Sequence, residues 1–100
     1  MADVLERQRI DRWLWHARLV RTRGAAAALA EAGYVRVNGT RIEASSRMVR
    51  TGDVITVALD RRVRVVRVTG FAERRGPPQT VAGLYQDVDR GIRWEAAGGR

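Results

Sequence analysis

The first apolar pattern along the chain has the period of an α-helix. Apolar side chains recur at intervals of three and four residues, and together they form one stripe of Ile10, Trp13, Leu14 and Ala17. We therefore predict a helix over residues 10–19, with Trp13 in the core. Thr22 is a good N-cap for the alanine-rich run that follows it, and Gly33 is placed to end that run. A second helix is predicted over residues 23–32.

After Gly33 the period of the apolar positions changes to two, which is typical of β-strands. Val35 and Val37 alternate with polar neighbours, and the dipeptide Asn38-Gly39 that follows is a strong hairpin signal. The predicted strands cover residues 34–37, 40–42, 54–59 and 63–71, the last with a doubled valine that would fit a bulge. Residues 43–50 are predicted to be irregular, with Met48 and Val49 as candidate core anchors.

The predicted elements divide the chain into three parts. They are a flexible arm at residues 1–8, a folded domain at residues 9–72 and a C-terminal segment at residues 73–100. In that segment Thr80 is expected to cap a short helix containing Val81, Leu84 and Tyr85. Ile92 and Trp94 are candidates to dock on the core, and residues 95–100 are expected to be disordered. The predicted fold class is α+β, with two short helices on a small, twisted, mainly antiparallel sheet and a short C-terminal helix.

Composition adds the class of partner to this picture. The chain has 100 residues, enough for one domain, and its 19 basic residues are all arginine, giving a net charge of +8 and a pI of about 11.6. A basic domain of this size points to phosphate-rich partners or anionic membranes, and we favour nucleic acid. The chain has no cysteine, no signal-peptide pattern and no apolar run of membrane-spanning length, so we expect a cytoplasmic protein without disulfides.

The candidate site is a cluster of arginines in and around the two predicted helices. Arg9, Arg12, Arg18, Arg21 and Arg23 all fall between residues 9 and 23, where only Asp11 opposes them. Thr22 and Arg23 open the second helix, whose free backbone N–H groups and dipole favour a phosphate. Guanidinium groups also bind phosphates bidentately and stack on exposed bases. These features favour RNA over the alternative of a solvated basic helix face.

Side chains near this cluster have two interpretations each. Trp15 would either stack on a base or pack partly against the domain. Arg36, Asn38 and Arg41 would either serve the hairpin alone or extend the basic groove. Asp11 is expected to favour the helix start or to pair with an arginine, and the lone His16 to pack or to lie at the surface.

The remaining charged residues carry no catalytic pattern. Arginines at positions 61, 62, 64 and 67 are expected to form a solvated strand edge rather than a second binding patch. The sequence contains no Gly-rich phosphate loop, metal-ligand cluster or nucleophile elbow. We therefore predict a binding protein rather than an enzyme, with no cofactor and no metal.

The motifs, in this order, resemble the RNA-binding domain family first recognised in the fourth small-subunit ribosomal protein. The matching pieces are Arg9-Ile10-Asp11, Leu14, Thr22-Arg23, Ala26 to Leu29, Gly33 to Gly39 and Gly52-Asp53-Val54. Each piece is weak alone, but the ordered set over residues 9–59 is specific. The resemblance implies that Arg9 and Arg23 grip large-subunit rRNA or tRNA.

A narrower resemblance, over about residues 9–86, is to a branch of small bacterial heat-shock proteins. It rests on Asp11 to Trp15, Ala17-Arg18, Thr22-Arg23 and Arg74-Arg75 before Leu84-Tyr85. Members of this branch are implied to bind the free large ribosomal subunit when a stalled nascent chain on tRNA remains attached. The partners implied are large-subunit rRNA and peptidyl-tRNA, with no membrane, and we expect a monomer. The alternatives are a general tRNA or small-RNA binder, an accessory subunit of an RNA-modifying enzyme, and a module that binds an acidic protein.

Overall fold

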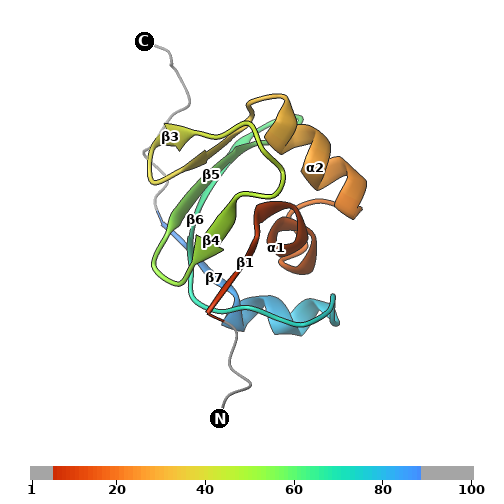
Figure 1. The fold of residues 1–100 in the computed structure, drawn as a ribbon. Coiled ribbons are helices and arrows are strands. Elements are labelled where there is room, and N and C mark those ends of the chain that lie inside the picture. The colour runs from red at the N-terminus through yellow and green to blue at the C-terminus, as the bar shows by residue number, and fades with distance from the viewer. Residues whose placement is uncertain (1–5, 89–100) are drawn as a thin grey trace.

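The computed structural model of the protein describes residues 6–88 and confirms the predicted α+β class. In chain order the elements are β1 (Arg7–Arg9), α1 (Ile10–His16), α2 (Arg23–Glu31), β2 (Val35–Val37), β3 (Thr40–Arg41), β4 (Met48–Arg50), β5 (Val54–Ala58), β6 (Val63–Val68), the 3-10 helix η1 (Pro78–Gly83) and β7 (Tyr85–Asp87). Both α-helices lie on one side of the strands (Figure 1). The prediction of two helices packed on an antiparallel sheet is therefore correct.

The helices begin where the sequence predicts, but α1 ends earlier than expected. It ends at His16 rather than at residue 19, because Arg18 adopts a left-handed backbone with φ of 63° that an α-helix cannot continue. At the start of α2 the Thr22 Oγ1 accepts a hydrogen bond from the Ala25 N–H at 3.0 Å, as the N-cap prediction requires. Gly33, with φ of 86°, turns the chain out of this helix.

A five-stranded antiparallel sheet supports the helices, with strand order β3-β2-β5-β6-β7. Asn38 has a positive φ of 52°, which suits the tight turn predicted between β2 and β3. The strands β5 and β6 pair without interruption across Val65 and Val66, so the prediction of a bulge at the doubled valine is wrong. Neighbouring residues of a strand point to opposite faces, and both valines are buried, so the doubling reflects burial on both faces of β6.

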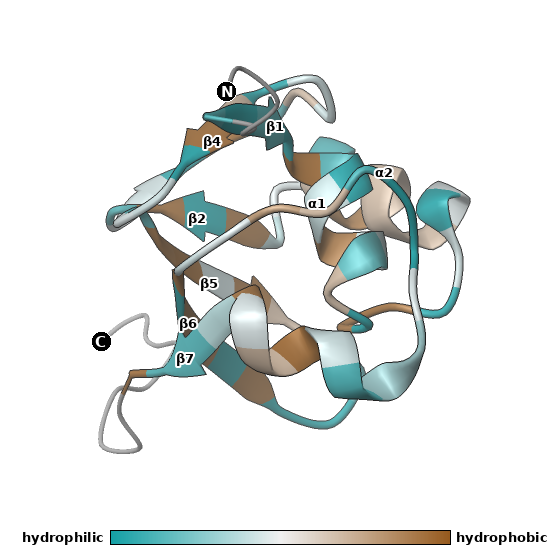
Figure 2. Ribbon diagram, turned by 90° about the horizontal axis from the view of Figure 1, so that it is seen from below, coloured by the Kyte–Doolittle hydropathy of each residue, from teal (hydrophilic) through white to brown (hydrophobic). Residues whose placement is uncertain are grey.

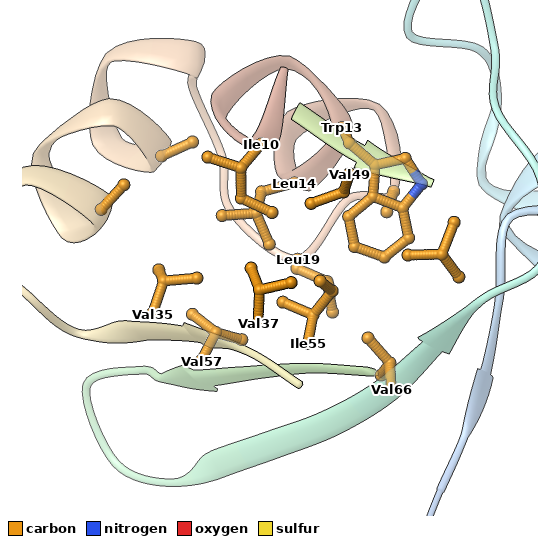
Figure 3. Packing of buried hydrophobic residues seen from close by; sticks show 14 of the residues in the cluster. Ile10, Trp13, Leu14, Leu19, Val35, Val37, Val49, Ile55, Val57 and Val66 are labelled. Carbon is orange, nitrogen blue, oxygen red and sulfur yellow. The ribbon is translucent and has the colours of Figure 1, made fainter. Parts of the chain in front are cut away.

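The hydrophobic core lies between α1 and the inner face of this sheet. Ile10, Trp13 and Leu14 project from α1 towards valines of β2, β5 and β6 (Figure 3). Trp13 is completely buried, as predicted, and its indole N–H donates to the Gly70 carbonyl at 3.1 Å. The small side chains of Ala26 and Ala30 are also fully buried, which lets α2 pack closely beside α1.

A two-stranded antiparallel ribbon, formed by β1 and β4, lies outside the main sheet (Figure 1). Residues 7 and 8 were expected in a flexible arm, and residues 43–50 were expected to be irregular, so both expectations differ from the structure here. The expected anchor Val49 is completely buried, whereas Met48 is 39% exposed and does not anchor the core. Strands of three residues each are too short to show a period in the sequence.

The segment of residues 70–76, which follows β6, is bound to α1 and its flanks. The hydrogen bonds are Trp13 Nε1 to Gly70 O, Gln8 Nε2 to Ala72 O, His16 Nδ1 to Ala72 O, Arg75 Nε to Trp15 O, and Arg18 Nε to Gly76 O, with lengths from 2.9 to 3.3 Å. Most of them reach backbone carbonyls of the segment, so its path depends little on its own side chains. This attachment positions Arg75 beside the end of α1.

The helix predicted after Thr80 is a 3-10 helix that begins at Pro78, two residues before Thr80. The Thr80 hydroxyl donates to the Pro77 carbonyl at 2.7 Å, so it does not act as the predicted N-cap. Tyr85 was expected in this helix but opens β7, opposite Val68 of β6. Ile92, Trp94 and residues 95–100 lie outside the described residues. Within residues 6–88 no helix has the length and apolar character needed to cross a membrane.

Candidate nucleic-acid interface

The carboxylate of Asp11 holds two of the predicted RNA-binding arginines. It accepts hydrogen bonds from Arg9 Nε at 3.1 Å and from Arg9 Nη2 at 2.9 Å, and it lies 3.7 Å from Arg23 Nη2. Its side chain is only 4% exposed, whereas those of Arg9 and Arg23 are 44% and 41% exposed. The prediction that Asp11 pairs with an arginine is confirmed. Arg9 directly precedes α1 and Arg23 is the first residue of α2, so one buried carboxylate aligns guanidinium groups at the starts of both helices.

The geometry of this pair suits phosphate binding. A guanidinium carries five N–H groups, and Asp11 accepts from Arg9 through only its Nε and Nη2, while its 3.7 Å contact with Arg23 is an ion pair without a hydrogen bond. The exposed remainder of Arg9 and Arg23 can therefore face a ligand while the inner edge stays fixed. A guanidinium held in place in this way loses little side-chain entropy when it binds an anion. The Thr22 hydroxyl caps α2 and so stabilises the helix start that carries Arg23.

Arg23 and two further arginines, Arg12 and Arg75, lie close to the imidazole of His16. The imidazole of His16 is buried, and its Nδ1 carries a proton because the Ala72 carbonyl at 3.0 Å can only accept. Burial lowers the pKa of His16, the bond to Ala72 opposes this shift, and the positive charges of Arg12, Arg23 and Arg75 lower the pKa further. His16 is therefore a packed, neutral side chain beneath a positive surface, in agreement with the prediction that it packs.

Trp15 lies half-buried at the edge of this surface. The guanidinium carbon of Arg75 is 5.9 Å from the centre of the Trp15 ring, within cation–π range, and Arg75 also donates to the Trp15 carbonyl. The Trp15 ring is in addition 5.4 Å from the His16 ring. Sequence reasoning did not place Arg75 in the site, because it lies 60 positions from Trp15 and only the 70–76 segment brings it there.

The other predicted site residues are spread more widely. Arg12 and Arg21 are exposed, on α1 and in the loop before α2. Arg18 is exposed but directs its Nε to the Gly76 carbonyl at 3.3 Å, so it also fastens the 70–76 segment. These three arginines, with Arg9 and Arg23, belong to the two helices or to the residues that flank them, which together we call the helical side of the molecule.

The hairpin residues lie apart from the Asp11 cluster. Arg36 alternates with the buried Val35 and Val37, so it points to the face of the sheet away from the helices, and it is paired with Arg41 across β2 and β3. The Asn38 amide donates to Asp53 Oδ1 at 3.0 Å and accepts from the Val54 N–H at 2.9 Å. Asn38 therefore ties the hairpin to β5, and no described contact joins Arg36 or Arg41 to Arg9 or Arg23.

Comparison with known proteins places this surface in a recognised domain. The model of the S4 domain family matches residues 8–55, which include the last two residues of β1, both helices and the hairpin. The chain is 33% identical over 84 residues to heat shock protein 15 of Escherichia coli K12, an alignment that covers 84% of this chain and 62% of that protein. It is 32% identical over 95 residues to the heat shock protein 15 homolog of Aeromonas salmonicida, covering 95% of this chain and 71% of the relative.

A solved structure agrees with both sequence comparisons. Heat shock protein 15 of Vibrio cholerae, described as trimeric, superposes with a TM-score of 0.77 at 30% identity and covers 83% of each chain. The fold and the arginine-rich surface thus define an RNA-binding protein of the S4-domain class. Within that class, the chain belongs to the heat shock protein 15 family. It spans about three fifths of the length of the Escherichia coli relative.

Proposed function

We propose that this protein binds structured RNA of the large ribosomal subunit through Arg9, Arg12, Arg23 and the neighbouring arginines of the helical side. The observation that carries the proposal is the alignment of Arg9 and Arg23 by one buried carboxylate. The protein recognises the shape of the RNA phosphate backbone rather than the base sequence, because the aligned groups are guanidiniums, which suit phosphates. The protein acts by binding and catalyses no reaction.

The biological target in this proposal is a large subunit that has separated from its partner or stalled with a nascent chain still attached. Membership of the heat shock protein 15 family supports it, as does the presence of the arginine cluster within the S4 domain. On such a subunit the arginines would contact rRNA, with peptidyl-tRNA as a second ligand, and the protein would assist recycling or quality control in the cytoplasm.

The binding surface is tested by replacing both aligned arginines. We expect Arg9→Ala/Arg23→Ala to weaken binding to large-subunit rRNA by about tenfold or more, because two charge-assisted contacts are lost. The slope of log K against log salt should shrink by roughly 1.4 to 1.8, since each lost phosphate contact removes about 0.7 to 0.9. Fluorescence anisotropy over a salt series measures both quantities.

The matched control is Arg61→Ala/Arg62→Ala, which removes the same charge from the exposed turn between β5 and β6. If both double variants bind RNA equally well, net charge rather than the Asp11 cluster governs binding. Circular dichroism of each variant checks whether the fold is retained.

Sedimentation through a ribosome gradient tests the biological target. Tagged protein should migrate with free large subunits and not with intact ribosomes. Bound RNA dominated by tRNA or mixed transcripts would instead support a general RNA binder, and co-purification of an RNA-modifying enzyme would support an accessory subunit. For the oligomeric state we propose a monomer, although the Vibrio cholerae relative is described as trimeric, and light scattering of the purified protein measures it.

A further inference from the structure

The β1–β4 ribbon displays a second row of arginines. The register places Arg7 opposite Arg50 and Arg9 opposite Met48. Along each strand the exposed residues alternate with one buried residue, Gln8 in β1 and Val49 in β4. The buried pair faces the core, so the arginines share the outer face of the ribbon, and β1 is hydrophilic along its whole length (Figure 2). Arg47, directly before β4, is exposed as well.

Two arginines directly opposite each other on one face of a ribbon repel, because the Cβ atoms of such a pair are only about 4.5–5.5 Å apart. Glu6 directly precedes Arg7, and the acidic residue nearest to Arg50 along the chain is Asp53, in the turn after β4. Its carboxylate accepts from the Arg50 backbone N–H at 2.9 Å and from Asn38 Nδ2 at 3.0 Å. Within residues 6–88 no carboxylate pairs with the guanidinium of Arg7 or Arg50. An external anion would relieve this repulsion.

The ribbon is continuous with the surface held by Asp11. Arg9 belongs to both, since it ends β1 and also pairs with Asp11. The backbone of Ile10, the first residue of α1, donates to the Arg47 carbonyl at 2.7 Å, which fastens the start of the helix to the end of the ribbon. The ribbon and the Asp11 cluster therefore adjoin at Arg9.

We propose that the β1–β4 ribbon is a second RNA contact that grips the phosphate backbone of a duplex stem in the same RNA. The proposal rests on the proposed function, which it extends by naming a further site and its ligand. Arg7 and Arg50 each bind one phosphate, and Arg47 contributes at the same edge. The ribbon carries no aromatic side chain on which unpaired bases could stack. A stem read through its backbone is therefore the ligand, rather than a single strand.

The test uses an RNA hairpin with a stem of about 16 base pairs and, separately, an oligouridine strand of the same total length. We expect Arg7→Gln/Arg50→Gln to weaken hairpin binding by about tenfold and to reduce the salt slope by roughly 1.8, which is two phosphate contacts on a duplex. Binding to oligouridine should change no more than in the control. Arg7→Lys/Arg50→Lys keeps both charges and should retain most of the salt slope.

The control is Arg61→Gln/Arg62→Gln, which lowers the net charge equally. The ribbon proposal is overturned if Arg7→Gln/Arg50→Gln and this control have the same hairpin affinity and slope, or if the ribbon variant loses oligouridine as strongly as hairpin. If wild type binds neither RNA, the proposed function itself fails. If wild type binds the hairpin and only the Arg9 and Arg23 substitutions weaken it, the proposed function stands and the ribbon proposal falls.

Folding of the ribbon variant provides an independent check. Removing two opposed like charges should leave the thermal midpoint unchanged or raise it, because the repulsion between Arg7 and Arg50 is removed. A marked fall in the midpoint would show that these arginines stabilise the fold, and would count against the proposal. The single variants Arg7→Gln and Arg50→Gln then report the RNA contribution, each with about half of the slope change.

Discussion

At the scale of single residues, the most informative side chain is the acidic one on a basic surface. Asp11 lowers the net charge, yet it fixes the guanidinium of Arg9 through two hydrogen bonds and draws Arg23 to within 3.7 Å. It also accepts the Arg12 backbone N–H at 2.7 Å near the start of α1. The net charge predicts that removal of Asp11 strengthens RNA binding, whereas the alignment of Arg9 and Arg23 predicts that its removal weakens RNA binding.

We expect Asp11→Asn to weaken binding to large-subunit rRNA although it raises the net positive charge. The freed arginines must be ordered on binding, at a cost of about 0.5–1.5 kcal/mol each, so affinity should fall by about tenfold. Anisotropy titration at about physiological salt measures this change. Affinity equal to or tighter than that of wild type would show that charge outweighs positioning.

At the scale of elements, the 70–76 segment connects the S4 domain to the C-terminal part of the chain. It covers α1 with backbone carbonyls that accept from Gln8, Trp13, His16 and Arg18. In return Arg75 donates to the Trp15 carbonyl near the end of α1, where a cation also interacts favourably with the helix dipole. The left-handed residue Arg18 ends α1 and begins the turn towards α2, so it serves the fold as well as the charged surface.

Substitutions at Arg18 separate its backbone role from its side-chain role. With φ of 63°, an alanine keeps the cost of the left-handed conformation, whereas a glycine does not. We expect Arg18→Gly to be more stable than Arg18→Ala by about 1 kcal/mol, measured by urea denaturation. If Arg18 also contacts RNA, both variants lose affinity equally. Alanine as stable as glycine would contradict the assigned backbone strain.

At the scale of the whole molecule, arginines from distant parts of the chain lie close to the buried, neutral imidazole of His16. Arg12, Arg23 and Arg75 lie close enough to His16 to lower its pKa, in addition to the larger effect of burial. The unfolded chain binds a proton at the ordinary pKa of histidine, about 6.5, whereas the folded protein takes it up only at lower pH. Stability from this group is thus complete above the ordinary pKa and is lost as pH falls towards the lowered value.

We expect the free energy of unfolding to decrease as pH is lowered from about 7.5 to 5.5, the range in which histidine titrates. His16 is the only histidine of the chain, so His16→Gln should flatten the dependence in this range. Thermal melts at a series of pH values in constant salt give the comparison. A slope that is the same in wild type and variant would assign the pH dependence to other groups.

Local features of this protein follow from its sequence because they depend on neighbouring residues. The stripe of Ile10, Trp13 and Leu14, the Thr22 cap and the Asn38-Gly39 turn all appear as expected. Each is set by the spacing of a few residues or by the conformational preference of one. The family likeness is likewise readable in the order of these motifs.

The tertiary structure decided which distant residues meet. The ribbon pairs residues 7–9 with residues 48–50, and Arg75 reaches Trp15 only through the path of the 70–76 segment. The same holds for the hairpin, where the burial of Val35 and Val37 turns Arg36 away from the helices. Such contacts depend on the burial of apolar surface and on the hydrogen bonding of backbone groups across the whole fold. Short stretches of sequence therefore do not predict them.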